Sequence, residues 1–183
     1  MFKKLIAKVA RNLSEEQIPY IIIGGQAVLI YGEPRQTRDI DITLGVDIDQ
    51  KEKVLNLIRK AGLEALPENC EEFIDRTYVL PCLELKSHLR IDFIFSHSEY
   101  EKVALNRTNK ISINDTPVCF ASPEDLIIHK IIAGRSRDLE DVRTVLVKQK
   151  ELDVEYIEKW LNEFDKSVAA DYTNVFLKIM RGF

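Results

Sequence analysis

Hydrophobic and polar residues alternate in two segments of the chain, and this alternation predicts two β-strands. In residues 38–44 every second residue is apolar, and the positions between them include Asp39 and Asp41. Residues 90–95 alternate in the same way, with Asp92 among the residues of the second face. Side chains two residues apart on a strand point to the same face, so one face of each strand is expected to be buried and the other to carry carboxylates.

The remaining pattern predicts an α/β portion followed by helices. Short β-branched runs favour strands, whereas apolar residues at helical spacing, with capping residues and glycine stops, favour helices. Strands are predicted at residues 20–23, 38–44, 73–80, 83–86 and 90–95. Helices are predicted at residues 1–13, 26–31, 49–61, 123–132, 138–148, 153–164 and 172–180. The pattern thus changes from mixed α/β to all-helical near residue 120.

Length and composition indicate one folded domain spanning residues 1–183, with a mixed α/β core at 1–120 and a helical portion at 121–183 packed on it. The net charge of −4 argues against a surface coated with basic residues for long nucleic acids. Three cysteines match neither a zinc pattern nor a disulfide framework. The N-terminal segment is interrupted by lysines, and no stretch reaches the length of a membrane span, so we expect a cytoplasmic protein without a membrane partner.

The three strand aspartates are candidate metal ligands. Asp39 and Asp41 share a strand face, and two carboxylates about 4 Å apart repel by roughly 4 kcal/mol at an effective dielectric near 20. A divalent cation relieves this repulsion, and magnesium prefers a few carboxylate oxygens together with water. Asp92 on a second strand would complete the site. The structural alternative is that all three are solvated strand residues.

Gly24 and Gly25 are the candidate phosphate-binding turn. They follow the apolar run 20–23 and precede the predicted helix at 26–31. Glycine permits close approach of the backbone, and the amides at a helix N-terminus favour an anion. Seen alone, such a pair is more often a simple strand-to-helix turn.

Taken together, Gly24-Gly25, Asp39-Ile40-Asp41 and Ile91-Asp92-Phe93 resemble the signature of the polymerase-beta-like nucleotidyltransferase superfamily. The resemblance implies an α+β fold, with a small mixed sheet flanked by helices, and two Mg²⁺ ions, for which Mn²⁺ is the alternative. Asp39 and Asp41 would correspond to the paired metal ligands. Asp92 would be the third carboxylate and the general base for the acceptor hydroxyl. Many members carry serine after the first glycine, so Gly25 is a departure that leaves phosphate binding to backbone amides or to Gln26.

The helical portion extends the resemblance to the abortive-infection type toxin nucleotidyltransferases and their uncharacterised relatives. Its residues Lys130, Ala133, Arg135, Asp138 and Asp141 resemble their Lys-x-x-Ala, Arg and Asp-x-x-Asp motif. By this resemblance Lys130 would contact the triphosphate and Arg135 would lie near the phosphates, while Asp138 or Asp141 would order the helix pair or the acceptor site. The structural alternatives are a solvated lysine, an N-cap at Asp138 and its capping-box partner at Asp141.

Arg35 and Arg38, in the loop before the carboxylate strand, are further candidates for phosphate binding. The function that follows is transfer of a nucleoside monophosphate from a nucleoside triphosphate to a hydroxyl of an RNA, a protein or a small molecule. A toxin of this kind would also have an antitoxin partner. The alternatives are a catalytically silent relative that binds a nucleotide or a protein, and a metal-dependent phosphohydrolase that uses the same carboxylates.

Overall fold

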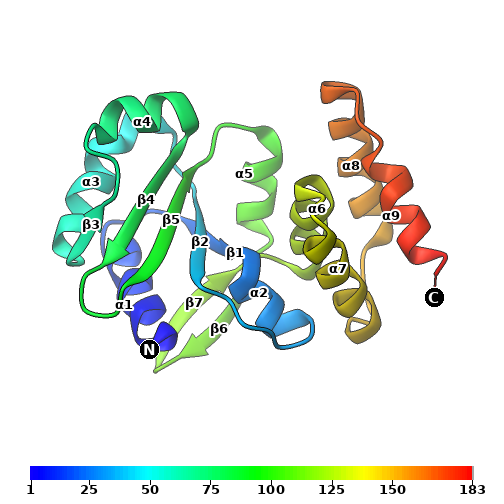
Figure 1. The fold of residues 1–183 in the computed structure, drawn as a ribbon, viewed down its shortest axis with the longest axis horizontal. Helices are drawn as coiled ribbons and strands as arrows, with labels where there is room; N and C mark the ends of the chain where they lie inside the picture. The colour runs from blue at the N-terminus through cyan, green and yellow to red at the C-terminus, as the bar shows by residue number, and fades with distance from the viewer. Residues whose placement is uncertain (183) are drawn as a thin grey trace. The chain divides into compact units, whose positions relative to one another are not determined.

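The computed structural model describes residues 1–182, which fall into two compact units (Figure 1). The sheet unit comprises residues 1–26 and 37–121, and the helical unit comprises residues 27–36 and the chain from Ser122 onward. The change from sheet to helices thus lies close to the position expected from the sequence pattern. The inclusion of residues 27–36 in the helical unit was not predicted.

A seven-stranded mixed sheet forms the centre of the sheet unit. Its strands are β1 (Tyr20–Ile23), β2 (Asp39–Leu44), β3 (Leu63–Ala65), β4 (Val79–Glu84), β5 (Leu89–Phe95), β6 (Asn109–Ile113) and β7 (Thr116–Phe120). They lie in the order β3-β4-β5-β2-β1-β7-β6. The pairs β2–β5 and β1–β7 are parallel, and the other neighbours are antiparallel. The fold is α+β, as the sequence predicted.

The alternation in β2 and β5 separates a buried face from a polar one. The apolar residues of β2 and β5 on one face are all buried, namely Ile40, Ile42, Leu44, Ile91, Phe93 and Phe95. The helices that begin in the sheet unit are α1 (Phe2–Glu15), α2 (Gly24–Tyr31), α3 (Lys51–Lys60), α4 (Cys70–Thr77) and α5 (Glu99–Asn106), with a short 3₁₀ helix η1 (Ile48–Gln50) before α3. Helix α1 packs on β6 and β7, α3 packs on β3, and the two helices contact each other.

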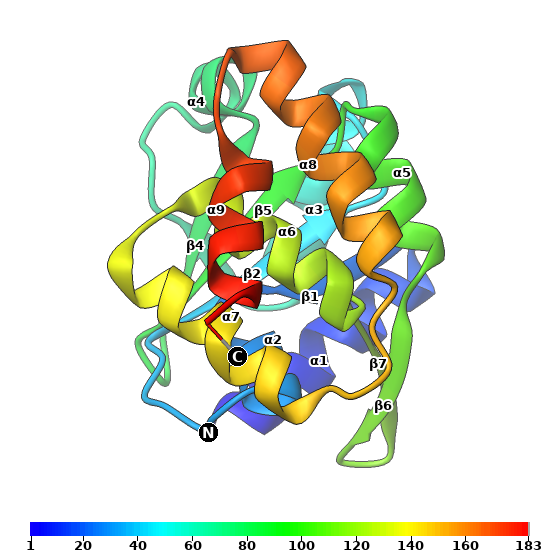
Figure 2. The same cartoon turned by 90° about the vertical axis from the view of Figure 1, so that its right-hand side faces the viewer.

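The helical unit contains four further helices, α6 (Pro123–Ala133), α7 (Ser136–Lys148), α8 (Val154–Val168) and α9 (Tyr172–Met180). The Ser122 hydroxyl caps α6 by accepting a hydrogen bond from the amide of Asp125, and Gly134 ends this helix in the left-handed conformation. Asp153 caps α8. Figure 2 shows α8 and α9 beside α6, and all three pairs among these helices are in contact.

Residues 70–77 are the main departure from the predicted elements. They form helix α4, whereas a strand had been predicted from Phe73 onward. Helix α5 and the hairpin of β6 and β7 have no counterpart in the prediction. Asp49, the first residue of the helix predicted at 49–61, lies inside η1, and the N-cap position of α3 is occupied by Gln50. Among the helices within residues 1–182, none combines the length and the apolar character needed to cross a membrane.

Candidate functional site

The sheet places the three candidate carboxylates on neighbouring strands. In the parallel pair of β2 and β5, Asp41 is in register with Asp92, and Asp39 is in register with Arg90. All three aspartates are half-buried, whereas Ile40 between the β2 pair is 1% exposed. The predicted strand face therefore exists, and it brings Asp39, Asp41 and Asp92 to one side of the sheet.

The glycine turn lies directly against this face. Gly24 directly follows β1 and begins α2 with a φ of +63°, a left-handed conformation that costs other residues about 1 kcal/mol or more. A Cβ atom at Gly24 would lie 1.9 Å from Asp41 Oδ2. Both the backbone conformation and the closeness of the carboxylate therefore require glycine at position 24. The turn expected to hold phosphate and the carboxylates expected to hold metal are in contact.

Arg90 is a member of the site that the sequence interpretation missed. Its Nε donates to Asp92 Oδ1 at 2.8 Å, and its side chain is about half exposed. This hydrogen bond, with added attraction from Asp39 and Asp41, raises the pKa of the Arg90 guanidinium above its ordinary value. The alternation of residues 90–95 already placed Arg90 on the carboxylate face. Arg90 is thus a fixed positive charge beside all three aspartates.

The donor atoms of this face fit a hard divalent cation. Carboxylate oxygens from two adjacent strands, with room for water, are the ligand type that Mg²⁺ prefers. Asp39 accepts a hydrogen bond from Thr37, and Asp92 is held by Arg90. In these orientations no three His, Cys, Asp or Glu side chains within residues 1–182 converge on one point. Binding of one cation by all three aspartates would therefore require these side chains to reorient, which for Asp92 means changing its hydrogen bond with Arg90.

The other candidates near the turn differ in their surroundings. Gln26 is buried, and its Nε2 donates to the main-chain oxygen of Asp39 at 3.4 Å. This contact makes Gln26 a support for the start of β2. Arg38 is exposed, immediately before Asp39. Both stay predicted nucleotide-binding residues.

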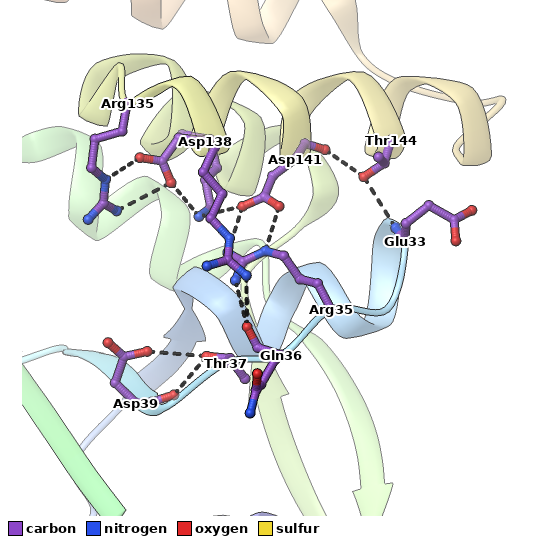
Figure 3. Close-up of polar contacts among 11 residues, drawn as sticks. Glu33, Arg35, Gln36, Thr37, Asp39, Arg135, Asp138, Asp141 and Thr144 are labelled. Atoms are coloured by element: carbon purple, nitrogen blue, oxygen red, sulfur yellow. Dashed lines mark hydrogen bonds and ion pairs between the residues drawn. The ribbon is translucent and has the colours of Figure 1, made fainter.

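The motif residues of the helical unit form a buried ion-pair cluster. Lys130 of α6 is only 5% exposed, and its Nζ lies 2.6 Å from Asp138 Oδ1 and 2.9 Å from Asp141 Oδ2. Arg135 donates to Asp138 through Nε, although its own side chain is 76% exposed. Figure 3 shows Asp138 and Asp141 of α7 with their arginine partners. We call Arg35, Lys130, Arg135, Asp138 and Asp141 the α7 ion-pair cluster.

The α7 ion-pair cluster corrects the structural alternatives considered for these residues. Helix α7 begins at Ser136, so Asp138 is not its N-cap, and Asp141 is not a capping-box partner. Lys130 is not a solvated charge, because it joins α6 to α7 through two carboxylates. Asp138 and Asp141 thus contact Lys130 of the neighbouring helix directly, while the role expected for them from the resemblance stays a prediction. Binding of phosphate by Lys130 or Arg135 stays a prediction.

Burial and hydrogen bonding act in opposite directions on the two aspartates. Burial by itself raises the pKa of Asp138, but hydrogen bonds from Arg135 and Lys130 outweigh it and leave the pKa below the ordinary value. For Asp141, burial also raises the pKa, and the hydrogen bonds from Arg35 and Lys130 lower it further than burial raises it. Both carboxylates are therefore ionised at neutral pH.

Arg35 belongs to this cluster as well. Its Nε and Nη2 each donate at 2.7 Å to the two oxygens of Asp141, a bidentate pair. Nearby, the Arg137 guanidinium donates to the main-chain oxygen of Gln36 at 3.0 Å, and the Thr144 hydroxyl accepts from the amide of Glu33 at 3.2 Å. Helix α7 thus holds residues 33–36. The sequence suggested Arg35 as a phosphate ligand, but in the structure its guanidinium binds the Asp141 carboxylate.

A family model matches residues 2–178, and its description is "Nucleotidyltransferase of unknown function (DUF6036)". The chain belongs to this nucleotidyltransferase family. The superfamily recognised from the glycine turn and the three aspartates is therefore confirmed. The closer relationship to the abortive-infection toxins stays a prediction. None of the curated proteins matches the chain.

Solved structures of nucleotidyltransferases share the fold at low sequence identity. The solution structure of the antibiotic-resistance factor ANT(2'')-Ia has a TM-score of 0.64 and 17% identity, covering 91% of this chain and 92% of that one. A crystal structure of ANT(2'')-Ia with adenylyl-2''-tobramycin has a TM-score of 0.63 and 17% identity, covering 92% and 98%. An antigenic nucleotidyltransferase-like protein from Paracoccidioides brasiliensis has a TM-score of 0.57 and 17% identity, covering 91% and 88%. At these identities the similarity establishes the fold.

Proposed function

We propose that this family member transfers a nucleoside monophosphate from a nucleoside triphosphate to an acceptor hydroxyl, and that divalent cations bound by Asp39, Asp41 and Asp92 are required. One observation carries the proposal. Asp41 is in register with Asp92 on the neighbouring strand, and Asp41 Oδ2 lies 1.9 Å from the position of a Cβ on Gly24. Carboxylates and a glycine turn at a helix N-terminus are thus in contact, as metal-bound triphosphate would need.

Each group in the sheet unit has a chemical task in this reaction. Bound divalent ions would neutralise the phosphate oxygens and align the attacking hydroxyl with the α-phosphorus, with pyrophosphate as the leaving group. Asp39 and Asp41 would hold the ions from one strand. Asp92 would accept the proton of the attacking hydroxyl. Arg90 would balance the charge of Asp92 until a cation and the substrate take its place.

The glycine turn would hold the triphosphate. At the start of α2 the main-chain amides of Gly24, Gly25 and Gln26 have no preceding helical carbonyl to bind, so an anion is favoured there. Arg38 lies exposed beside Asp39 and would add a positive charge. In the helical unit, Lys130 is paired with Asp138 and Asp141, and Arg135 is paired with Asp138, so phosphate binding by Lys130 or Arg135 stays a prediction.

The acceptor class is proposed from the chemistry of the reaction and from a structure with a similar fold. ANT(2'')-Ia, whose fold this chain shares, is described in complex with adenylyl-2''-tobramycin, an adenylylated small molecule. A small molecule rich in hydroxyls is therefore one acceptor class, and an RNA end or a protein hydroxyl are the others. The competing hypothesis is a catalytically silent relative that binds a nucleotide or a protein. The presence of all three aspartates argues against it.

Product analysis tests the proposal. The protein is incubated with each nucleoside triphosphate labelled at the α-phosphate, with Mg²⁺ or Mn²⁺, and with total RNA, total cell protein or an aminoglycoside mixture. The Asp39→Ala, Asp41→Ala double variant is the inactive comparison. Asp75→Ala, which alters a half-exposed carboxylate of α4 paired with Lys51, is the matched control.

The wild type and the Asp75→Ala variant should transfer label to one acceptor fraction, and the double variant should not. Release of labelled monophosphate without transfer would indicate a phosphohydrolase. If there is neither transfer nor metal-dependent nucleotide binding, the protein is a catalytically silent relative.

A further inference from the structure

Thr37 lies between the glycine turn and the first candidate metal ligand. Its Oγ1 is 3.2 Å from Asp39 Oδ1 and 3.4 Å from the main-chain oxygen of Asp39 (Figure 3). The contact with the carboxylate is longer than a typical hydrogen bond from a hydroxyl donor. Thr37 is half-buried, and it comes two residues before the strand that carries the aspartates. The loop thus supplies a hydroxyl group directly to the candidate metal site.

The Thr37 side chain packs closely against Gly25. A Cβ at position 25 would lie 2.4 Å from Thr37 Oγ1 and 2.9 Å from Thr37 Cβ. Unlike Gly24, Gly25 does not have a positive φ, so its backbone conformation is open to other residues. The close approach of Thr37 is therefore the reason for glycine at this position. It also accounts for the absence of the serine expected there, since a side chain at position 25 would compete for the same space.

Asp39 needs such a support because it is the first residue of β2. The register with β1 extends only as far as the pair of Ile23 with Asp41, so β1 does not pair with Asp39. On the other side Asp39 is in register with Arg90 of β5. A residue at the end of a strand has fewer contacts to fix it, so its orientation depends on the preceding loop. Threonine suits this task because its branched side chain is stiff at χ1.

We propose that Thr37 is a positioning residue of the metal site. Wedged against Gly25, its hydroxyl holds the Asp39 carboxylate in the orientation that binds a divalent cation. This inference rests on the proposed function, in which Asp39 is a metal ligand. It assigns to the loop threonine a role that the motif residues do not cover.

Mn²⁺ binding, followed by loss of the free-ion signal in electron paramagnetic resonance, tests the role without requiring turnover. Loss of a hydrogen bond to a charged group should weaken binding by a factor of about ten, which corresponds to roughly 1.4 kcal/mol. Thr37→Val, which keeps the shape and removes the hydroxyl, should weaken Mn²⁺ binding about tenfold. Thr37→Ser should restore it to within about twofold of the wild type.

The matched control is Thr77→Val. The Thr77 hydroxyl donates to the main-chain oxygen of Phe73 at 2.7 Å at the end of α4, so its loss should leave Mn²⁺ affinity unchanged. Thermal melting of every variant separates loss of folding from loss of the site. If Thr37→Val binds Mn²⁺ as tightly as the wild type while Asp39→Asn abolishes binding, Thr37 has no positioning role. If the wild type does not bind, or Asp39→Asn binds equally well, the metal site itself is wrong and the inference falls with it.

A double-variant cycle tests the contact with Gly25. Gly25→Ala should displace the Thr37 hydroxyl and weaken Mn²⁺ binding to a similar extent as Thr37→Ala. Because both changes remove the same hydrogen bond, the loss of affinity in the double variant should be clearly smaller than the sum of the two single losses, although the Cβ that alanine keeps at position 37 still lies 2.9 Å from a Cβ at position 25. Fully additive losses would contradict a shared cause.

Discussion

Replacement of Lys130 by methionine should destabilise the helical unit strongly. Lys130 is 5% exposed, and its ammonium group contacts two carboxylates whose side chains are 2% and 5% exposed. Methionine has a similar length but no charge, so Asp138 and Asp141 would stay buried with one partner fewer each. Loss of one member of a buried ion pair costs about 3 to 5 kcal/mol. Since each aspartate retains an arginine, we expect the lower end, about 3 kcal/mol.

The assay is equilibrium unfolding in urea, followed by the fluorescence of Trp160, the single tryptophan of the sequence, which lies in α8. Arg143→Gln is the control on helix α7. The pair of Arg143 with Glu140 is exposed by 46% and 65%, so its loss should change the free energy of unfolding by no more than about 0.5 kcal/mol. A loss below about 1 kcal/mol for Lys130→Met would refute the structural role of this lysine. Unchanged stability with weaker binding of nucleotide would instead favour the triphosphate contact.

Three further predictions concern pH, the glycine turn and a buried thiol. Because the pKa of Asp141 is lowered in the folded protein, its ionised carboxylate stabilises the fold fully at a pH above about 3.9, the pKa of an aspartate in the unfolded chain, and this stabilisation is lost as the pH falls through the folded pKa. When the pH is lowered from neutral to below about 4, urea titrations should therefore show a smaller loss of stability for Asp141→Asn than for the wild type. Gly24→Ala would place Cβ 1.9 Å from Asp41 Oδ2, so kcat/KM for transfer should fall about a hundredfold or more, and full activity would contradict the contact. Burial raises the pKa of Cys82 to about 12, so Ellman's reagent at pH 8 should label this thiol only after unfolding, and labelling in the native state would contradict its burial.

The sequence predicts the carboxylate face well because a strand with one buried face has a strict period of two. Asp39, Asp41 and Asp92 could be placed by that period without knowledge of the sheet order. The glycine turn was equally visible, since Gly24 stands between an apolar run and a helix. Arg90 was also on the alternating face, yet its contact with Asp92 depends on a side-chain rotamer that no pattern specifies.

Other features could not be predicted because they depend on contacts between distant parts of the chain. Thr37 is a loop threonine without periodic neighbours, and its closeness to Gly25 follows from the path of the chain between α2 and β2. Lys130 meets Asp138 only because Gly134 reverses the chain between two helices. Residues 73–80 were predicted to form a strand on the basis of Phe73 and its neighbours, but residues 70–77 form helix α4. The acidic residues in the first turn and Arg76 in the last turn of α4 favour the helix through its dipole.

The central claim is that the aspartates of β2 bind a divalent cation together with a nucleoside triphosphate. Isothermal titration of the wild type and of Asp41→Asn with each nucleoside triphosphate, with and without Mg²⁺, tests it most directly. The account predicts that at least one triphosphate binds to the wild type only when Mg²⁺ is present, and that Asp41→Asn loses this dependence. Equal binding with and without Mg²⁺, or equal behaviour of the two proteins, would contradict it.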